Sequence, residues 1–279
     1  MAKTRRKLKE DLNLVDIVAE IIDARIPISS RNPEIDSIIS NKPRFIILNK
    51  SDLADNLQTI KWQQYYKSMS IPSIKLDSMK NKAIPEFHKI CKLILNDKIQ
   101  KWNLKGMKGK NIKVMIVGIP NVGKSTIINN LTKKKRAKAE NKPGVTRSNQ
   151  WFSINDGLEL LDTPGVLWPK FGSQAVAQNL AFTGAIKDSI LDYEDLAFNF
   201  IKILTSKYPE SLIKRFNISL SDFEGPNIII ESIGKKRGIL MPGGNIDTEK
   251  TSQIIINEFK SGKLGQITLE SVDDIIDRK

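Results

Sequence analysis

One eight-residue stretch constrains the fold of this chain more than any other. Residues 118–125 read Gly-Ile-Pro-Asn-Val-Gly-Lys-Ser and fit the pattern G-x-x-x-x-G-K-[ST] without a mismatch. An apolar run typical of a buried strand precedes the stretch at residues 112–117, and residues 126–131 read as the first turns of a helix. A strand, a glycine-rich loop and a helix in this order place backbone N–H groups and the positive end of a helix dipole around an anion. The stretch therefore predicts a phosphate loop that binds a nucleoside triphosphate.

The residue types in this loop suit phosphate and metal chemistry. The Lys124 ammonium would neutralise the β- and γ-phosphates, and the Ser125 hydroxyl would bind Mg²⁺. The expected phosphate-binding residues are Asn121, Val122, Gly123, Lys124, Ser125 and Thr126. The alternative is a glycine-rich turn that fits the pattern by chance, and the strand before the loop and the helix after it argue against that alternative.

A second motif, Asn49-Lys50-Ser51-Asp52, indicates the base. It follows an apolar run at residues 44–48, at the carboxyl end of an expected strand, where open α/β sheets bind their ligands. The Asp52 carboxylate can accept hydrogen bonds from N1–H and the amino group of guanine, whereas adenine has an acceptor at N1 and would be repelled. Asn49 can bond the N7 edge, and the Lys50 stem can cover the ring. The expected base-binding residues are Asn49, Lys50, Ser51, Asp52, Asp77 and Ser78. The last two follow the next expected strand, where a backbone N–H can meet guanine O6.

A third segment, Asp162-Thr163-Pro164-Gly165, completes the expected site. Its first residue supplies a carboxylate for the Mg²⁺ shell, and the Gly165 N–H can meet the γ-phosphate. Thr146 lies in a polar segment, residues 133–147, and is the expected hydroxyl ligand that senses that phosphate. The expected metal ligands are Ser125, Thr146 and Asp162.

The order of these motifs is unusual. An ordinary GTPase has the phosphate loop first and the Asn-Lys-x-Asp and serine segments last, whereas here the last two come first. A sheet tolerates such a permutation when the original termini were adjacent, and a Lys/Gly/Asn-rich linker at residues 97–111 would join them. Six expected strands interleaved with helices predict a doubly wound α/β sheet over residues 1–172. Helical spacing dominates beyond that point, so we expect a smaller helical domain at residues 173–279.

This motif order resembles the circularly permuted GTPases, most closely the ribosome biogenesis GTPase A family. The resemblance covers nearly the whole chain and runs through residues 1–6, 23–27, 49–52, 118–125 and 162–165. It implies a GTP hydrolase that docks on an immature large ribosomal subunit and is released after hydrolysis, with a C-terminal domain that contacts ribosomal RNA. It also implies that K⁺, liganded partly by Asn121, replaces an arginine finger. The expected catalytic residues are Lys124, Thr146 and Asn121.

The sequence departs at one place from the pattern of the family that it resembles, and at another from the pattern of many GTPases. Family members usually carry a Trp-Phe-Pro-Gly-His segment ahead of Met-Ala-Lys, and this sequence begins at that methionine, so a role of the segment's histidine in hydrolysis is not carried over from the resemblance. Val166 follows the Asp-x-x-Gly segment, where many GTPases place a glutamine that orients the attacking water. Arg147, beside the expected threonine ligand, is a candidate finger that could equally bind RNA. We expect slow intrinsic hydrolysis that the ribosome accelerates.

The charge of the chain indicates a polyanionic partner. The formal net charge is +14, and basic residues cluster at residues 3–9, 98–113 and 133–138. An AT-rich genome can also raise the lysine content, so the clustering of these residues beside a nucleotide site is the better guide. Such clusters favour RNA over a merely solvated surface.

The composition of the chain indicates the cellular compartment in which the protein works. One cysteine, Cys91, excludes an internal disulfide and fits a reducing cytoplasm, and no apolar run approaches the ~18 residues of a spanning helix. We expect a cytoplasmic protein that binds GTP or GDP, Mg²⁺ and K⁺, does not bind membranes and is a monomer away from the ribosome. Two alternatives remain: a GTP-switched RNA-binding module with little turnover, and a small-molecule kinase, against which the Asn-Lys-x-Asp motif argues.

Overall fold

The computed structural model describes residues 2–77, 83–132, 150–154, 157–163, 172–219 and 225–276. The chain divides into two compact units, Met1–Phe171 with Glu270–Lys279, and Gly172–Leu269. The expected range 173–279 for the second domain therefore extends ten residues too far. The Glu270 carboxylate accepts hydrogen bonds from the backbone N–H groups of Ile28 and Ser29, at 2.7 and 3.0 Å, and Val272 packs in the core beside Trp62. These contacts attach the last residues to the first unit.

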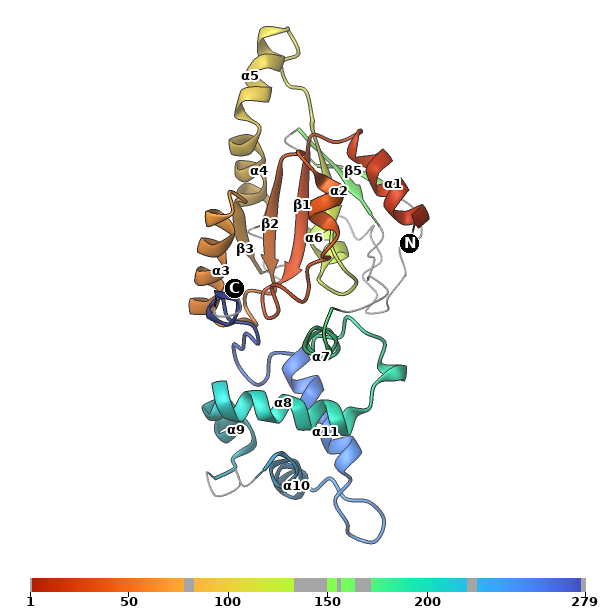
Figure 1. Ribbon diagram of the computed structural model, residues 1–279, viewed down its shortest axis with the longest axis vertical. Helices are drawn as coiled ribbons and strands as arrows, with labels where there is room; N and C mark the ends of the chain where they lie inside the picture. The colour runs from red at the N-terminus through yellow and green to blue at the C-terminus, as the bar shows by residue number, and fades with distance from the viewer. Residues whose placement is uncertain are drawn as a thin grey trace. The chain divides into compact units, whose positions relative to one another are not determined.

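The first unit contains a six-stranded sheet in the order β3-β2-β1-β4-β6-β5 (Figure 1). The strands are β1 (Ile17–Asp23), β2 (Arg44–Asn49), β3 (Ser73–Leu76), β4 (Ile112–Val117), β5 (Gln150–Ile154) and β6 (Leu158–Asp162). Five strands run parallel, and β5 at the edge pairs antiparallel with β6. The predicted α/β sheet is confirmed.

Helices cover both faces of this sheet, so it is doubly wound. Val18 and Ile22 lie four residues apart on β1 and share one face; Val18 packs with α1 (Ala2–Leu12) and α2 (Ile35–Ile39), and Ile22 with α3 (Asn56–Ser68). Phe45 points to the opposite face, where its ring lies 5.4 Å from that of Phe87 on α4 (Ala83–Ile94). Helix α6 (Lys124–Thr132) packs against α4.

The segment expected to be a linker, residues 97–111, contains most of a helix. Helix α5 spans Asn96–Leu104, and its Trp102 is buried, with the ammonium groups of Lys98 and Lys110 at 5.4 and 4.6 Å from the ring centroid. The lysine and glycine content predicted a linker, but burial of one tryptophan stabilises the turns around it. Only the residues after α5 form an irregular connection to β4.

The second unit is helical. Its elements are α7 (Gln174–Phe182), the short 3₁₀ helix η1 (Asp188–Ile190), α8 (Tyr193–Lys207), α9 (Pro209–Phe216), α10 (Pro226–Arg237) and α11 (Thr248–Lys260). The rings of Phe182 and Phe259 lie 5.0 and 4.8 Å from that of Phe200, which forms the centre of the core. Helix α10 packs closely on its neighbours at Gly234, where a Cβ would come within 2.5 Å of the Ile246 side chain.

A last short helix, α12 (Asp273–Ile276), belongs to the first unit. Among the residues that the structure describes, none of the helices combines the length and the apolar character needed to cross a membrane.

Candidate nucleotide-binding site

The sequence motifs meet at one edge of the sheet. The parallel strands β1, β2, β4 and β6 end there at Asp23, Asn49, Val117 and Asp162. From β1 the chain proceeds outward through β2 and β3, whereas from β4 it proceeds to β6 on the other side. The strand order thus reverses between the neighbours β1 and β4, and open α/β sheets bind ligands at the carboxyl ends of the strands at such a point. The phosphate loop follows β4.

The backbone of the phosphate loop depends on its glycines. A Cβ on Gly118 would lie 2.5 Å from the carbonyl oxygen of Ile21 on β1, so only glycine allows the loop to pass so close to the neighbouring strand. Gly123 has φ of 98°, a left-handed conformation that side chains disfavour. Lys124 opens α6, and its buried ammonium donates hydrogen bonds to the carbonyl oxygens of Gly118 and Ile119 at 3.0 and 2.7 Å. The lysine therefore points back over the loop, as phosphate neutralisation requires.

Burial perturbs the two opposite charges at this end of the site. It lowers the pKa of Lys124 to about 8, partly offset by the Asp162 carboxylate, and raises the pKa of Asp162 to about 6, partly offset by Lys124. The Oδ1 atom of Asp162 is buried and accepts no hydrogen bond from the described residues. Neighbouring groups therefore offset the desolvation of the Lys124 ammonium and of the Asp162 carboxylate only in part.

This donor set fits Mg²⁺. Asp162 offers a carboxylate oxygen with a free acceptor position, and Ser125 lies in the first turn of α6, beside Lys124. No group of three or more His, Cys, Asp or Glu side chains that could hold a metal ion occurs in the described part of the chain. A site with so few carboxylates suits Mg²⁺, which keeps several waters and shares the phosphates of a nucleotide.

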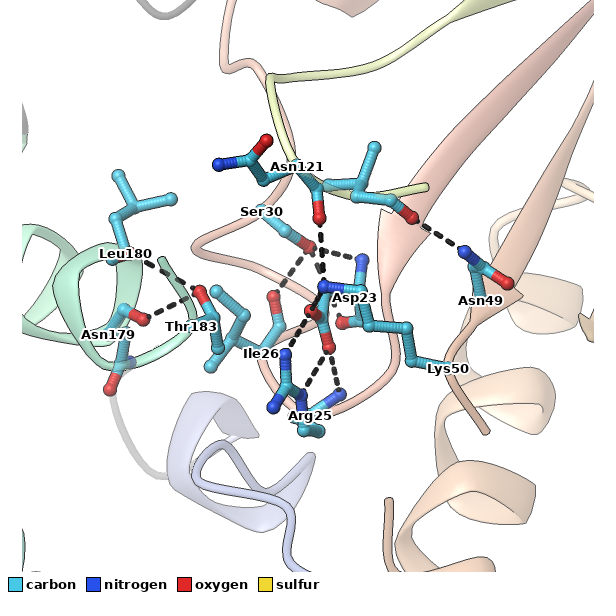
Figure 2. A network of polar contacts seen from close by, with 11 residues as sticks. Asp23, Arg25, Ile26, Ser30, Asn49, Lys50, Asn121, Asn179, Leu180 and Thr183 are labelled. Atoms are coloured by element: carbon cyan, nitrogen blue, oxygen red, sulfur yellow. Dashed lines mark hydrogen bonds and ion pairs between the residues drawn. The ribbon is translucent and has the colours of Figure 1, made fainter. Parts of the chain in front are cut away.

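The loop expected to recognise the base is hydrogen-bonded directly to the expected phosphate loop. The Asn49 side-chain amide donates to the carbonyl oxygen of Val122 at 2.6 Å, and the Lys50 ammonium donates to that of Asn121 at 2.8 Å (Figure 2). The backbone N–H of Ser51 donates to the carbonyl oxygen of Leu76 at the end of β3, at 3.2 Å. Tertiary folding therefore brings together two motifs that lie about seventy residues apart.

One part of the site was not assigned a role from the sequence. Asp23, at the end of β1, is buried and contacts Arg25 through both carboxylate oxygens, at 3.0 and 2.8 Å, and Lys50 at 2.9 Å. Burial alone would raise the pKa of the Asp23 carboxyl, but Arg25 and Lys50 hold it well below its ordinary value. The signal was present: the Asp-Ala-Arg segment directly follows the strand beside the Asn-Lys-x-Asp strand.

The remaining expected site residues fall into two groups. Asp52, Asp77, Ser125 and Thr126 are half-buried and lie on loops or helix turns at the same edge of the sheet. Ser78, Thr146 and Gly165 lie outside the described residues, as do Arg147, Val166 and the basic run at residues 133–138.

Comparison with known proteins places these features in a family context. The model of a family described as "50S ribosome-binding GTPase" matches residues 113–232. The chain is 46% identical over 277 residues to ribosome biogenesis GTPase A of Bacillus cereus, covering 98% of this chain and 92% of that protein. It is 31% identical over 273 residues to ribosome biogenesis GTPase A of Thermotoga maritima, again covering 98% and 92% of the two chains.

Two solved structures resemble the fold over nearly its whole length. The GDP-bound structure of TM YlqF has a TM-score of 0.68 and 28% sequence identity, with 96% of this chain and 100% of that chain covered. The GNP-bound structure of YlqF from T. maritima has a TM-score of 0.63 and 29% identity, with 96% and 98% covered.

Proposed function

The chain belongs to the ribosome biogenesis GTPase A family and is a GTPase involved in ribosome biogenesis, and from this premise we propose that it acts on the immature large ribosomal subunit. In this proposal the protein binds ribosomal RNA in the GTP state and leaves after hydrolysis to GDP and phosphate. It works in the cytoplasm, and it is a monomer away from the ribosome.

One observation carries the proposed nucleotide site. Asn49 and Lys50 donate hydrogen bonds to two consecutive carbonyl groups of the phosphate loop, those of Val122 and Asn121. These bonds fix the distance between the loop that would read guanine and the loop that would hold the phosphates. In the proposed assignment, Asp52 accepts from the guanine edge, the segment at Asp77 and Ser78 offers a backbone donor, and the Gly165 N–H meets the γ-phosphate.

Hydrolysis of the γ-phosphate depends mainly on positioning and charge neutralisation. Lys124 lies within the loop that would cradle the phosphates, and among the described residues its buried ammonium contacts backbone carbonyls and no carboxylate at hydrogen-bond distance. The proposed Mg²⁺ ligands are Ser125, Thr146 and Asp162, and the bound ion would neutralise negative charge on the phosphates. The Asp162 oxygen without a hydrogen-bond partner supports its place in this set.

A potassium ion is part of the same proposal. Asn121 has φ of 62°, a left-handed conformation that is rare for residues with a side chain, and its backbone carbonyl is engaged by Lys50. In Figure 2 its side-chain amide points away from that contact. This orientation supports a role for the amide oxygen as a ligand of K⁺ beside the phosphates, where extra positive charge favours hydrolysis.

Exposed basic residues in both units support the proposed RNA contacts. In the second unit, Lys235, Lys236 and Arg237 form the exposed end of α10. In the first unit, Arg5, Arg6 and Lys7 are exposed on α1. Lysines and arginines at such positions can contact phosphates without sequence specificity, so binding should weaken steeply with salt.

The alternative function, a GTP-switched RNA-binding module, differs from the proposed one only in the rate of GTP hydrolysis. Val166 lacks a polar group to orient water, which favours slow hydrolysis by the isolated protein. The kinase alternative is not favoured, because the family shown here consists of GTPases.

The proposal is tested by co-sedimentation of the full chain with purified large and small ribosomal subunits. We expect binding to immature large subunits with a non-hydrolysable GTP analogue and release with GDP. The matched control is Asp52→Asn. This variant should bind large subunits with a non-hydrolysable xanthosine triphosphate analogue and be released with xanthosine diphosphate, and it should not respond to the guanine nucleotides. That result would show that the nucleotide acts through this site. Equal binding in both nucleotide states, or a preference for the small subunit, would contradict the proposal.

A further inference from the structure

We propose that Asp23 is a positioning residue for guanine nucleotide binding, because its buried carboxylate holds the Lys50 ammonium against the phosphate loop. The inference rests on the proposed nucleotide site and adds to it a residue outside its motifs. Asp23 would touch neither base nor phosphate. It would act through Lys50.

The geometry around Asp23 is that of an anchored carboxylate. Its Oδ1 accepts from the Arg25 backbone N–H and from Arg25 Nε, both at 3.0 Å, and its Oδ2 accepts from Arg25 Nη2 at 2.8 Å. Its backbone N–H donates to Ser30 Oγ at 2.9 Å, and that hydroxyl donates to the Ile26 carbonyl at 2.7 Å. Asp23 and Arg25 are at most 2% exposed. The turn after β1 thus holds the carboxylate rigidly from one side.

On its other side the carboxylate faces Lys50. The Lys50 ammonium lies 2.9 Å from Asp23 Oδ2 and donates to the Asn121 carbonyl at 2.8 Å, so one group joins β1, the base loop and the phosphate loop (Figure 2). The backbone N–H of Ala24 also donates to the Asn49 carbonyl at 2.8 Å. The Asp23 turn therefore contacts the base loop through both backbone and side chain.

The backbone at this contact is strained. Lys50 and Asn121 both have positive φ, 58° and 62°, although neither is glycine. Such conformations persist where surrounding contacts determine them, and here the ion pair with Asp23 supplies one of those contacts. Without the carboxylate, Lys50 would lose the partner that offsets its buried charge and would be freer to leave the phosphate loop. The stem of Lys50, which would cover guanine, would then lose its fixed position.

The proposal is tested by a double-mutant cycle on nucleotide affinity. The variants are Asp23→Asn, Lys50→Met and the two together; methionine keeps an apolar stem over the base but has no ammonium. Affinities for fluorescent GDP and GTP are measured, with free energies of unfolding in urea as a separate reading. The matched control is Asp16→Asn, because Asp16 lies just before the opposite end of β1, where it accepts from Lys98 Nζ and the Lys113 N–H.

We expect Asp23→Asn and Lys50→Met each to weaken GDP and GTP binding about 10- to 100-fold, the range for loss of a hydrogen bond to a charged group. Because both act on the same contact, the double variant should be scarcely weaker than either single variant. Asp16→Asn should leave affinity within about twofold, and its effect should add to that of Lys50→Met. Additive effects of Asp23→Asn and Lys50→Met, or an unchanged affinity in Asp23→Asn, would overturn the proposal.

A second measurement covers the case in which Asp23→Asn does not fold. Lys50→Met leaves the Asp23–Arg25 pair intact, and we expect it to increase amide hydrogen exchange in both the turn at residues 24–26 and the loop at residues 119–123. Unchanged exchange in either segment would overturn the proposal. Failure of the nucleotide site itself gives a different result: Asp52→Asn would then leave GDP affinity unchanged, whatever the cycle shows.

Discussion

The two ends of the proposed nucleotide site differ in how their charged side chains are compensated by neighbouring groups. At the base end, Lys50 lies 2.9 Å from Asp23, which Arg25 also contacts, and the pKa of Asp23 is held below its ordinary value. At the phosphate end, Lys124 donates to two backbone carbonyls, and burial raises the pKa of Asp162 to about 6. Charged partners within the protein neutralise one another at the base end, whereas at the phosphate end Lys124 and Asp162 are only partly compensated.

This difference implies that the charges at one end make the loop rigid, whereas those at the other end contribute to ligand affinity. A buried ion pair within the protein holds its loop before any ligand arrives, whereas a buried charge with a weak partner gains most when a ligand of opposite charge binds. We infer that the base end is preorganised and that phosphate and Mg²⁺ stabilise the other end. The predictions below test this contrast, from the largest expected effect to the smallest.

Lys124→Ala should weaken GDP and GTP binding about 1000-fold, because truncating one partner of a buried charge pair costs 2–5 kcal/mol or more. The free energy of unfolding of the nucleotide-free variant should change little, because the substitution removes a desolvated ammonium, and this gain offsets the loss of its two hydrogen bonds to carbonyls. Fluorescent-nucleotide titration and urea unfolding measure the two quantities. Lys50→Ala is the matched comparison and should cost clearly more stability. Equal losses of unfolding free energy in the two variants would contradict the proposed difference between the base end and the phosphate end.

Asp52→Asn should weaken GTP binding about 10- to 100-fold, because guanine loses a charged acceptor for its N1–H and amino groups. The same variant should gain affinity for xanthosine triphosphate, whose 2-oxo group accepts from an amide. Competition titration with the two nucleotides measures the change. If the variant retains wild-type preference for GTP, Asp52 does not read the base.

Hydrolysis should be about tenfold faster in KCl than in NaCl at equal ionic strength, which is well below the ~10³–10⁵ that an arginine finger supplies. Asn121→Ala should remove this difference while leaving GDP affinity nearly intact, because GDP lacks the γ-phosphate. Phosphate release by the free and the ribosome-bound protein measures the rates. Equal rates in the two salts would leave Arg147 or the ribosome as the source of the missing charge.

Cys91 provides the smallest expected effect. Burial raises the pKa of its thiol to about 12, so a thiol reagent at pH 8 should react only when the region around α4 opens. Lys124→Ala should leave the reaction rate within about twofold of wild type, because its cost lies in ligand binding. Lys50→Ala should accelerate the reaction, since it removes a contact that holds the fold. The same rate in both variants would show that the ion pair with Asp23 does not stabilise the unit.

Local patterns in the sequence were sufficient for most of the fold. Four of the strands, β1, β2, β4 and β6, are largely buried apolar runs. The three motifs lie at the carboxyl ends of β2, β4 and β6, so their common edge could be predicted from parallel strand ends. The helix at Asn96–Leu104 could not, because its lysine-rich composition resembles a linker and its stability depends on the burial of Trp102. The last ten residues could not be assigned either, because contacts such as those of Glu270 with Ile28 and Ser29 join distant parts of the chain.

The sequence by itself was sufficient to predict the chemistry: an expected phosphate loop, an expected guanine-reading motif and an expected carboxylate ligand for the metal, in permuted order. Only the tertiary structure decided which of these charges are neutralised within the protein. Asp23 and Lys50 are far apart in the chain, and nothing local distinguishes their pairing from that of two solvated charges. Their pairing depends on the parallel register that sets Asp23 opposite Asn49 and on the burial of that strand edge, because a charge removed from water must find its partner within the fold.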